Sequence, residues 1–452
     1  MRRGLAAIAS VVTLASCRAP PTATSLTAPD PVPCPAGASA DGGARETVDA
    51  TTLDRKMMLG YQGWFFCPGD GSPDDDWNHW FSMPTNPTPA SVTVDFLPDM
   101  TEVPAVEQCP TPLVLADGSV VAVYSAYRAA SVLRHFQWMK DYDLDGVFLQ
   151  RLSHNLPYPD RFEERNVVAE NVRTAAEQTG RIFAMMYDIS GEDPSTFVAR
   201  IEQDWQFLVD SLALTASPQY AHHHGYPVVG LWGFGADGRP GTPRDELDLL
   251  AFFHADGPYH ATVYGGVTTD WRTRTDCVAG VCWSDALGQF DVISPWSVGT
   301  YVDAASAYAY GNTVRADIAA ATAAGRDYAP VVFPGFSWHN KTPGAPTNQI
   351  PRDAGRFYWS QVVADIGAGS TMMYGAMFDE VDEGTAMFKV VPTAVALPAS
   401  PAFVPLDADG YRLPSDWYLQ LAGEAGRTLR GERLACGALP LSLPSVTATV
   451  VP

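Results

Sequence analysis

The stretch Gly146–Ile189 decides the fold, because it opens with GVFLQRL at Gly146–Leu152 and closes with RIFAMMYDI at Arg181–Ile189. Both runs are almost continuously apolar, and the amphipathic segment Asp160–Gln178 lies between them. Strands that are apolar on both faces and are separated by a helix are typical of a parallel sheet covered by helices. The stretch therefore predicts one strand–helix–strand unit.

The same alternation continues from about residue 55 to about residue 435. The other predicted strands are Lys56–Phe65, Pro227–Phe234, Ala261–Val267, Phe290–Trp296, Tyr328–Phe336 and Ser370–Glu380. The other predicted helices are Tyr127–Tyr142, Pro194–Leu214, Pro243–Asp256, Ala304–Ala324, Arg352–Ile366 and Ser415–Leu429, the last with Ser415 as its N-cap. Eight such strands favour an α/β fold of the (β/α)8 TIM-barrel type over an open doubly wound sheet. No Gly-rich phosphate-binding turn follows the first strand, which weakens the doubly wound alternative. Ser119–Tyr124 follows the turn ADG and predicts a β-hairpin in the long first loop.

The N-terminus has the pattern of a targeting segment, with Arg2 and Arg3 before the short apolar run Leu5–Leu14. The following LASC, Leu14–Cys17, resembles a bacterial lipoprotein signal, which implies that Cys17 becomes the lipid-modified first mature residue. The alternative is a plain secretory signal cut nearby, and either way the protein is exported. We predict a signal peptide at 1–16, a flexible Pro-, Ala- and Thr-rich tether at 17–50, one large domain at 51–436 and a tail at 437–452.

Six cysteines follow Cys17, an even number that suggests disulfides in an oxidising compartment. Cys277 and Cys282 are near enough in sequence to close a small loop. Cys67–Cys109 and Cys34–Cys436 would then be the remaining pairs, among the fifteen connectivities that six cysteines allow. No CxxC spacing occurs, which argues against a zinc site. We expect no cofactor, and we assign no residue as a metal ligand.

Composition limits the partners. The chain is 46% hydrophobic, 18% charged and carries a formal net charge of −22. A surface this acidic repels nucleic acid and anionic lipid headgroups. We expect a monomer that binds a neutral carbohydrate and meets the cell envelope only through a lipid anchor at Cys17.

Polar and aromatic side chains gather where the predicted strands end, which is the active-site face of a TIM barrel. Aromatic rings stack on sugar C–H faces and planar polar groups bind sugar hydroxyls, although any single Trp is more often a core residue. The candidate substrate-binding residues are Tyr61, Gln62, Trp64, His79, Trp80, Gln150, Arg151, Tyr187, Asp188, Trp232, Trp296, Trp338 and His339.

The densest acidic cluster, FDEVDEGT at Phe378–Thr385, follows the eighth predicted strand. A pair of carboxyl groups at a barrel mouth is the minimum for glycoside hydrolysis, one acting as acid and the other as base or nucleophile. Glu380 and Glu383 can cooperate only if the strand stops near Glu380 and the chain curls, which Gly384 would help. The alternatives are a solvated acidic loop or a calcium site.

Other polar clusters carry weaker signals. His222–His224 precedes a strand and predicts a surface loop, with adventitious metal binding as the alternative. Asp74–Asp76 lies in a Gly- and Pro-rich loop that is either solvated or a calcium site. Asp188 is either a site carboxylate or a capping residue.

At these residues the chain resembles the glycoside hydrolase family 71/99-like group, which includes endo-α-mannosidases and whose eighth-strand motif is FNEWHEGT. Phe378–Thr385 stands in its place, with Val381 and Asp382 where the family has Trp and His. The aromatic-rich first-strand pattern of the family is similar to Trp64–Gly71 followed by Trp77–Trp80, and the resemblance covers about 56–389.

The resemblance implies a (β/α)8 fold and, in the endo-mannosidase branch, retaining hydrolysis of α-mannosides. It implies that Glu380 deprotonates the 2-hydroxyl of the sugar and that Glu383 is first general acid and then base. The related α-1,3-glucanase branch has Asp at the first position.

Two classes of function therefore remain. The first is an exported, membrane-tethered glycoside hydrolase that acts on an α-linked polysaccharide or glycan, mannan- or glucan-like. The second is a catalytically inactive carbohydrate-binding surface lipoprotein of the same fold. Both predict sugar binding, but only the first predicts turnover that Glu383→Gln abolishes.

Overall fold

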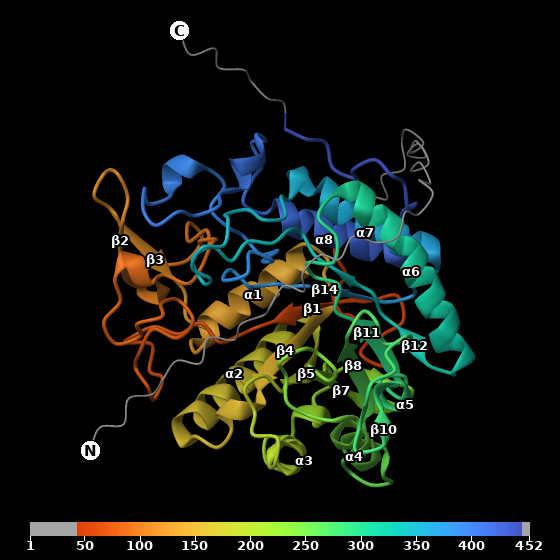
Figure 1. Cartoon of the computed structure of the whole chain (residues 1–452). Helices are drawn as coiled ribbons and strands as arrows, with labels where there is room; N and C mark the ends of the chain where they lie inside the picture. The colour runs from red at the N-terminus through yellow and green to blue at the C-terminus, as the bar shows by residue number, and fades with distance from the viewer. Residues whose placement is uncertain (1–42, 445–452) are drawn as a thin grey trace.

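The computed structural model describes residues 43–444, and Figure 1 shows parallel strands surrounded by helices. The barrel strands in chain order are β1 (Met57–Tyr61), β4 (Gly146–Leu152), β5 (Ile182–Asp188), β7 (Tyr226–Trp232), β8 (Thr262–Val267), β11 (Val292–Pro295), β12 (Asp327–Tyr328), β13 (Val331–Val332) and β14 (Met373–Gly375). All neighbouring pairs among them are parallel, in the order β12-β11-β8-β7-β5-β4-β1-β14-β13. The predicted fold class, a (β/α)8 TIM barrel, is confirmed.

The sheet closes through the seventh predicted strand, which is broken into two pieces. β12 pairs with β11, whereas β13 pairs with β14. Ala329 donates its backbone N–H to Ile293, and the carbonyl of Pro330 accepts from Tyr374. Because proline has no N–H to offer a ladder, the strand passes from one neighbour to the other at this point.

Helices follow most strands and cover the outside of the barrel. They are α1 (Ala129–Asp141), α2 (Pro159–Thr179), α3 (Phe197–Asp210), α4 (Pro243–His254), α5 (Trp283–Ala286), α6 (Ala304–Ala323), α7 (Arg356–Ala368) and α8 (Trp417–Leu429). The predicted helices are therefore confirmed to within a few residues at most ends. The N-cap of α8 is Asp416, not Ser415, and its side chain bonds the Tyr142 hydroxyl at 2.5 Å instead of capping the helix.

Side chains fill the centre of the barrel. The rings of Phe148 and Tyr264 lie 4.6 Å apart, and Tyr374 packs 5.9 Å from Phe148. A Cβ on Gly60 would lie 2.1 Å from Met377, so only glycine fits beside that side chain. The interior is a packed core, and any site must lie at the rim.

Two small hairpins lie outside the barrel. The predicted hairpin in the first loop is formed by β2 (Cys109–Val114) and β3 (Val120–Val123), and the Cys67–Cys109 disulfide ties it to the end of β1. The second hairpin, β9 (Cys277–Val278) and β10 (Val281–Cys282), is closed by the Cys277–Cys282 disulfide. Two of the predicted pairs are confirmed, and the third includes Cys34, which lies outside the described residues.

The folded body begins before the predicted boundary at 51. Val48 is buried, and Arg45 bonds Asp143 through its backbone N–H and its guanidinium. Residues 45–50 are therefore part of the domain and not of a tether. Cys17, the signal peptide and most of the tether lie outside the described residues, so they stay predictions.

At the other end, residues 437–444 form no strand, although Leu439, Leu441 and Leu443 pack against the core. Within residues 43–444, no helix combines the length and the apolar composition that crossing a bilayer requires.

Candidate active site

The predicted curl of the chain after the eighth strand is confirmed. β14 ends at Gly375, and residues 381–384 form a turn. Gly384 has φ +66°, and a Cβ there would lie 2.7 Å from the backbone nitrogen of Ser337. That nitrogen donates a hydrogen bond of 3.0 Å to the carbonyl of Glu383, so the turn packs on the loop after β13. Glycine is required here both for its conformation and for the close approach.

Glu380 is buried and held by two donors. The Gln62 side-chain amide donates to Oε1 at 2.5 Å, and the Thr385 hydroxyl donates to Oε2 at 2.7 Å. Only 5% of the residue is exposed. Burial, followed by the negative charge of Glu383, raises the pKa of the Glu380 carboxyl well above its usual range. Glu380 can therefore carry a proton near neutral pH.

Glu383 lies in a different environment. Its carboxylate is about a quarter exposed and bonds the Lys341 ammonium at 2.9 Å. The same ammonium contacts Asp382 at 3.1 Å. Burial acts to raise the pKa of Asp382, but the charge of Lys341 and the contact with His79 outweigh it and lower that pKa to about 2. Because an ammonium already bridges the two carboxylates, the calcium alternative is not favoured.

Asp379 joins the ends of β1 and β14. Its two carboxylate oxygens accept the backbone N–H groups of Gln62 at 2.7 Å and Gly63 at 3.1 Å. These bonds fix Gln62 where it reaches Glu380. Burial nevertheless raises the pKa of Asp379 to about 7.

Two stacked rings, those of Trp64 and His79, lie beside the acidic turn. The ring of His79 stacks on Trp64 with centroids 4.4 Å apart and planes 12° apart. His79 Nδ1 lies 3.7 Å from the Asp382 carboxylate. Among residues 43–444 the indole N–H of Trp64 has no hydrogen-bond partner. The structure thus brings three of the predicted binding residues, Gln62, Trp64 and His79, to the acidic turn, where Gln62 contacts Glu380 and His79 lies near Asp382.

The loop after β13 supplies two further predicted residues. His339 is fixed in that loop, because its backbone N–H donates to Asp95 at 2.7 Å and its Nδ1 lies 2.5 Å from the Ala345 carbonyl. The indole N–H of the neighbouring Trp338 is buried and has no hydrogen-bond partner in the described part of the chain.

Four predicted binding residues belong to the core instead, so these predictions are wrong. Arg151 forms two bonds of 2.6 Å with Asp204 of α3, and the Tyr187 hydroxyl donates to the same carboxylate. Neither Arg151 nor Tyr187 is exposed. Successive strand residues point to opposite faces, so these two side chains point outward to the helices and not into the barrel.

Tyr61 and Trp80 are the other two. Tyr61 is fully buried and its hydroxyl lies 2.9 Å from His135 Nδ1. Trp80 is 1% exposed and packs against Phe65 at 4.5 Å. Neither side chain can reach a ligand at the rim.

Two more predicted residues have structural partners close to the rim. Gln150 points into the barrel and donates to the Tyr374 hydroxyl at 3.1 Å. Asp188 accepts the backbone N–H and the hydroxyl of Ser190, so it caps the turn after β5. Burial raises the pKa of Asp188.

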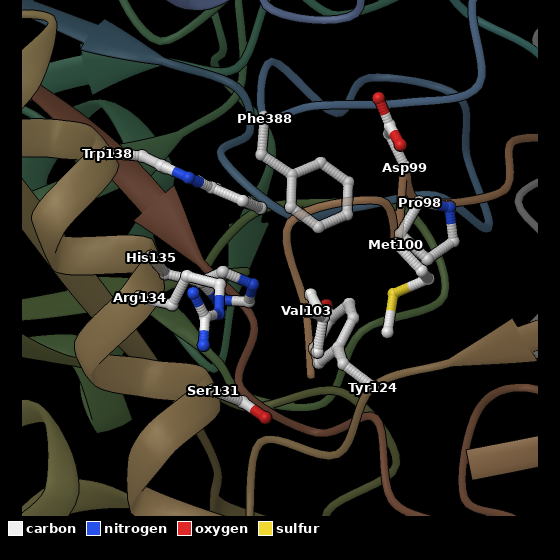
Figure 2. A pocket seen from close by; sticks show the side chains of 10 residues that line it. All are labelled: Pro98, Asp99, Met100, Val103, Tyr124, Ser131, Arg134, His135, Trp138 and Phe388. Carbon is white, nitrogen blue, oxygen red and sulfur yellow. The ribbon is translucent and has the colours of Figure 1, made fainter. Parts of the chain in front are cut away.

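The remaining predicted residues, Trp232 and Trp296, line a cavity of about 530 Å³ at the C-terminal ends of β7, β8 and β11. This volume lies within the range of small-molecule binding sites. A second cavity, shown in Figure 2, lies between α1 and Phe388 and has only about 10 Å³. That is room for one water molecule at most, so it is no substrate site.

The histidine run lies at the opposite, N-terminal end of the barrel. His223 is buried, contrary to the predicted surface loop, and both His223 and His224 contact Asp327 at 2.9 Å. This triad has the geometry of a metal site. However, the backbone N–H of Leu53 donates to His223 Nδ1, so the ring proton is on Nε2 and points at the carboxylate. The triad is therefore a clamp that holds the segment before β1.

Arg161 pairs with two carboxylates of the Asp74–Asp76 loop. Its guanidinium lies 2.7 Å from Asp74 and 3.8 Å from Asp76. A cation bound by this loop would have to displace Arg161.

Comparisons with known proteins bear on the fold. No protein-family model matches the sequence, and no curated protein is similar to it. Among solved structures, the GH99 endo-α-mannosidase from Bacteroides thetaiotaomicron superposes with a TM-score of 0.61 at 15% identity, over 84% of this chain and 99% of that one. The same organism's GH99 endo-α-mannosidase in complex with BIS-TRIS-propane gives a TM-score of 0.59 at 15% identity, over 84% of this chain and 98% of that one. The chain has the fold of these endo-α-mannosidases. At 15% identity this likeness shows the fold alone.

Reasoning from the sequence did not identify Lys341, Asp379 and Thr385 as site residues. Thr385 and Asp379 belong to the acidic motif, so the sequence places them close to Glu380. Their hydrogen-bond partners could not be predicted from the sequence. Lys341 directly follows the predicted strand end Trp338–Asn340. That position was the only signal in the sequence for the cation of the site.

Proposed function

We propose that the protein is an exported glycoside hydrolase that cleaves an α-linked polysaccharide or glycan, mannan- or glucan-like, with Glu380 and Glu383 as its two acid–base groups. The observation that carries this proposal is the contrast between the two carboxyl groups. Glu380 is buried and bonded only by neutral donors, whereas Glu383 bonds an ammonium. In enzymes, acid–base pairs typically consist of two titratable groups whose different environments give them different proton affinities.

The geometry favours specific roles. Glu380, whose pKa burial raises, is suited to donate a proton to the leaving oxygen. Glu383, whose carboxylate lies 2.9 Å from the Lys341 ammonium, is suited to attack the anomeric carbon or to activate a water. This is the reverse of the roles that the resemblance implies.

The surroundings suit a carbohydrate. The ring of His79 is partly exposed beside the acidic turn, and Trp232 and Trp296 line the large cavity at the same end of the barrel. The two disulfides support export, since such bonds persist in oxidising compartments. Anchoring through a lipid on Cys17 is part of the proposal.

The first test is turnover on a panel of α-mannans, α-1,3-glucans and plant glycans. We expect release of sugar by the wild-type protein and a fall in kcat of about 10²- to 10⁴-fold in both Glu380→Gln and Glu383→Gln. Glu170→Gln, which changes a glutamate on the exposed surface of α2, is the matched control and retains full activity. Sugar binding without turnover on any substrate would favour the inactive carbohydrate-binding protein.

The second test separates the roles. A substrate with an activated leaving group, such as a glycosyl fluoride, does not need a general acid. Glu380→Gln should therefore retain far more activity on the fluoride than on the glycan, whereas Glu383→Gln should lose both. The anomer of the first product, read by NMR, then distinguishes attack by Glu383, which retains configuration, from attack by water, which inverts it.

A further inference from the structure

The cavity beside Trp232 and Trp296 has a chemistry of its own. Loops that follow β7 and β8 form its walls, and its volume is about 530 Å³. The acidic turn of Glu380 and Glu383 follows β14, which is not a neighbour of β7 or β8 in the sheet. The cavity is therefore a separate part of the barrel mouth.

Its rim is held together by Arg274. The guanidinium of Arg274 donates to the carbonyl of Gly235 in the loop after β7 and bonds Asp276 at 2.8 Å. The Cys277–Cys282 disulfide closes the next turn of the same loop. The charge of Arg274 is thus balanced by Asp276. These bonds and the disulfide fix the rim in the absence of a ligand.

Two other carboxylates of the lining are left without a cation. Asp237 and Asp270 are exposed to the cavity, and within residues 43–444 neither forms an ion pair. Arg239 adds one further positive charge beside the cavity, because its guanidinium lies 5.2 Å from the centroid of the Trp232 ring. Asp276 and the two unpaired aspartates still outnumber the two arginines, so the surroundings of the cavity carry an excess of negative charge. Such a site attracts a cation and repels an anion.

The aromatic wall points to the same chemistry. The rings of Trp232 and Trp296 meet edge to face, with centroids 5.5 Å apart and planes 78° apart. Both side chains are partly exposed. The Arg239 guanidinium already covers one face of Trp232, so a cation is accommodated at this corner, and the partly exposed Trp296 remains accessible to a ligand. A tryptophan face attracts an ammonium group and also stacks on the C–H face of a sugar ring.

We propose that this cavity binds a sugar unit that carries a protonated amino group. In this reading the ring of the sugar packs on the tryptophan corner, and its ammonium group lies between Asp237 and Asp270. An N-acetylated sugar lacks the charge and binds more weakly, and a uronic acid is excluded. The inference rests on the proposed function only in treating the ligand as part of a glycan substrate.

The test is isothermal titration calorimetry at pH 6 on the Glu383→Gln protein, which removes turnover. The probes are matched pairs, glucosamine against N-acetylglucosamine and mannosamine against mannose, together with glucuronate. We expect each amino sugar to bind at least tenfold more tightly than its neutral counterpart, with a ratio that shrinks as salt is added. Glucuronate should give no heat of binding.

Variants at the lining assign that preference to the cavity. Asp237→Asn combined with Asp270→Asn should bring the amino and neutral sugars to within about twofold of each other. Asp256→Asn, an exposed aspartate after α4, should leave the ratio unchanged. Equal affinity within each pair, or a ratio that survives the double change, would overturn the inference.

The outcome is separable from that of the hydrolase proposal. A preference for amino sugars in a protein that hydrolyses no glycan would support the cavity site and count against the enzyme. Turnover of neutral glycans with no preference for amino sugars would do the opposite.

Discussion

The two ends of the barrel both bury carboxylates, but they balance the charge differently. At the N-terminal end, Asp143 contacts Arg45 at 2.8 Å and Arg430 at 2.5 Å, and Asp145 contacts Arg45 at 2.8 Å. At the C-terminal end, Lys341 pairs with Asp382 and Glu383, whereas Asp379 and Glu380 accept only neutral donors. We refer to these groups as the base cluster and the mouth cluster.

The difference indicates that the base cluster stabilises the fold and that the mouth cluster is suited to the proposed catalysis. In the base cluster arginines match the aspartates, so the charges stabilise the fold. In the mouth cluster the carboxyl groups outnumber the one ammonium group. Crowded carboxyl groups repel one another when they are ionised, and such arrangements are found mainly at functional sites. Function in TIM barrels lies at the C-terminal ends of the strands, in agreement with this contrast.

The largest expected effect comes from breaking the base cluster. Asp143→Asn removes a buried charge that bonds two arginines, at a position whose φ of +60° asparagine tolerates. We expect the free energy of unfolding to fall by about 3 kcal/mol, measured by urea denaturation. Asp256→Asn is the surface control and should change it by less than about 0.5 kcal/mol. A change at Asp143 as small as the control would show that the base cluster contributes nothing to stability.

The second effect is a pH dependence that separates the clusters. The pKa of Asp379 is raised to about 7, so the folded state holds a proton that the unfolded chain releases near pH 4. Its contribution to stability is complete below about pH 4 and is lost as the pH rises through about 7. Between pH 5 and 7.5 this amounts to about 2.5 kcal/mol. The pH dependence of stability that comes from Asp143 has the opposite sign. Burial acts to raise the pKa of Asp143, but its bonds to Arg45 outweigh burial and lower that pKa. The stabilisation from Asp143 is therefore lost only in acid.

Asp379→Asn checks this sign. The variant loses the titration, so its stability relative to the wild-type protein should improve by about 2.5 kcal/mol when urea unfolding is repeated at pH 7.5 instead of pH 5. Asparagine also leaves one of the two N–H donors from Gln62 and Gly63 unpaired, which lowers stability equally at both pH values. A constant gap between the two proteins would mean that Asp379 is ionised throughout.

Much of this architecture could be predicted from the sequence, and its limits have physical causes. The apolar strands and the curl after Glu380 followed from local rules, because burial and glycine act within a few residues. The predictions for Arg151 and Tyr187 failed because the end of a strand does not reveal which face a side chain takes, and a shift of one residue reverses the face. Lys341 was missed because its partners are 41 and 42 residues away, and no local pattern fixes such a pairing.

The smallest expected effect sharpens the account of the mouth cluster. Lys341→Met keeps the length of the side chain but removes the cation between Asp382 and Glu383, so the Asp382 carboxylate, whose pKa that cation lowers, should take up a proton at higher pH. We expect the acid limb of the kcat/KM profile on the best glycan substrate to move up by about one pH unit. At a pH below the wild-type limb this corresponds to a loss of about tenfold in kcat/KM, and the loss disappears at a pH well above the shifted limb. Lys341→Arg restores the charge and should return the limb towards its wild-type position. A uniform loss of activity with an unmoved limb in Lys341→Met would assign Lys341 to the packing of the turn and not to the ionisation of its neighbours.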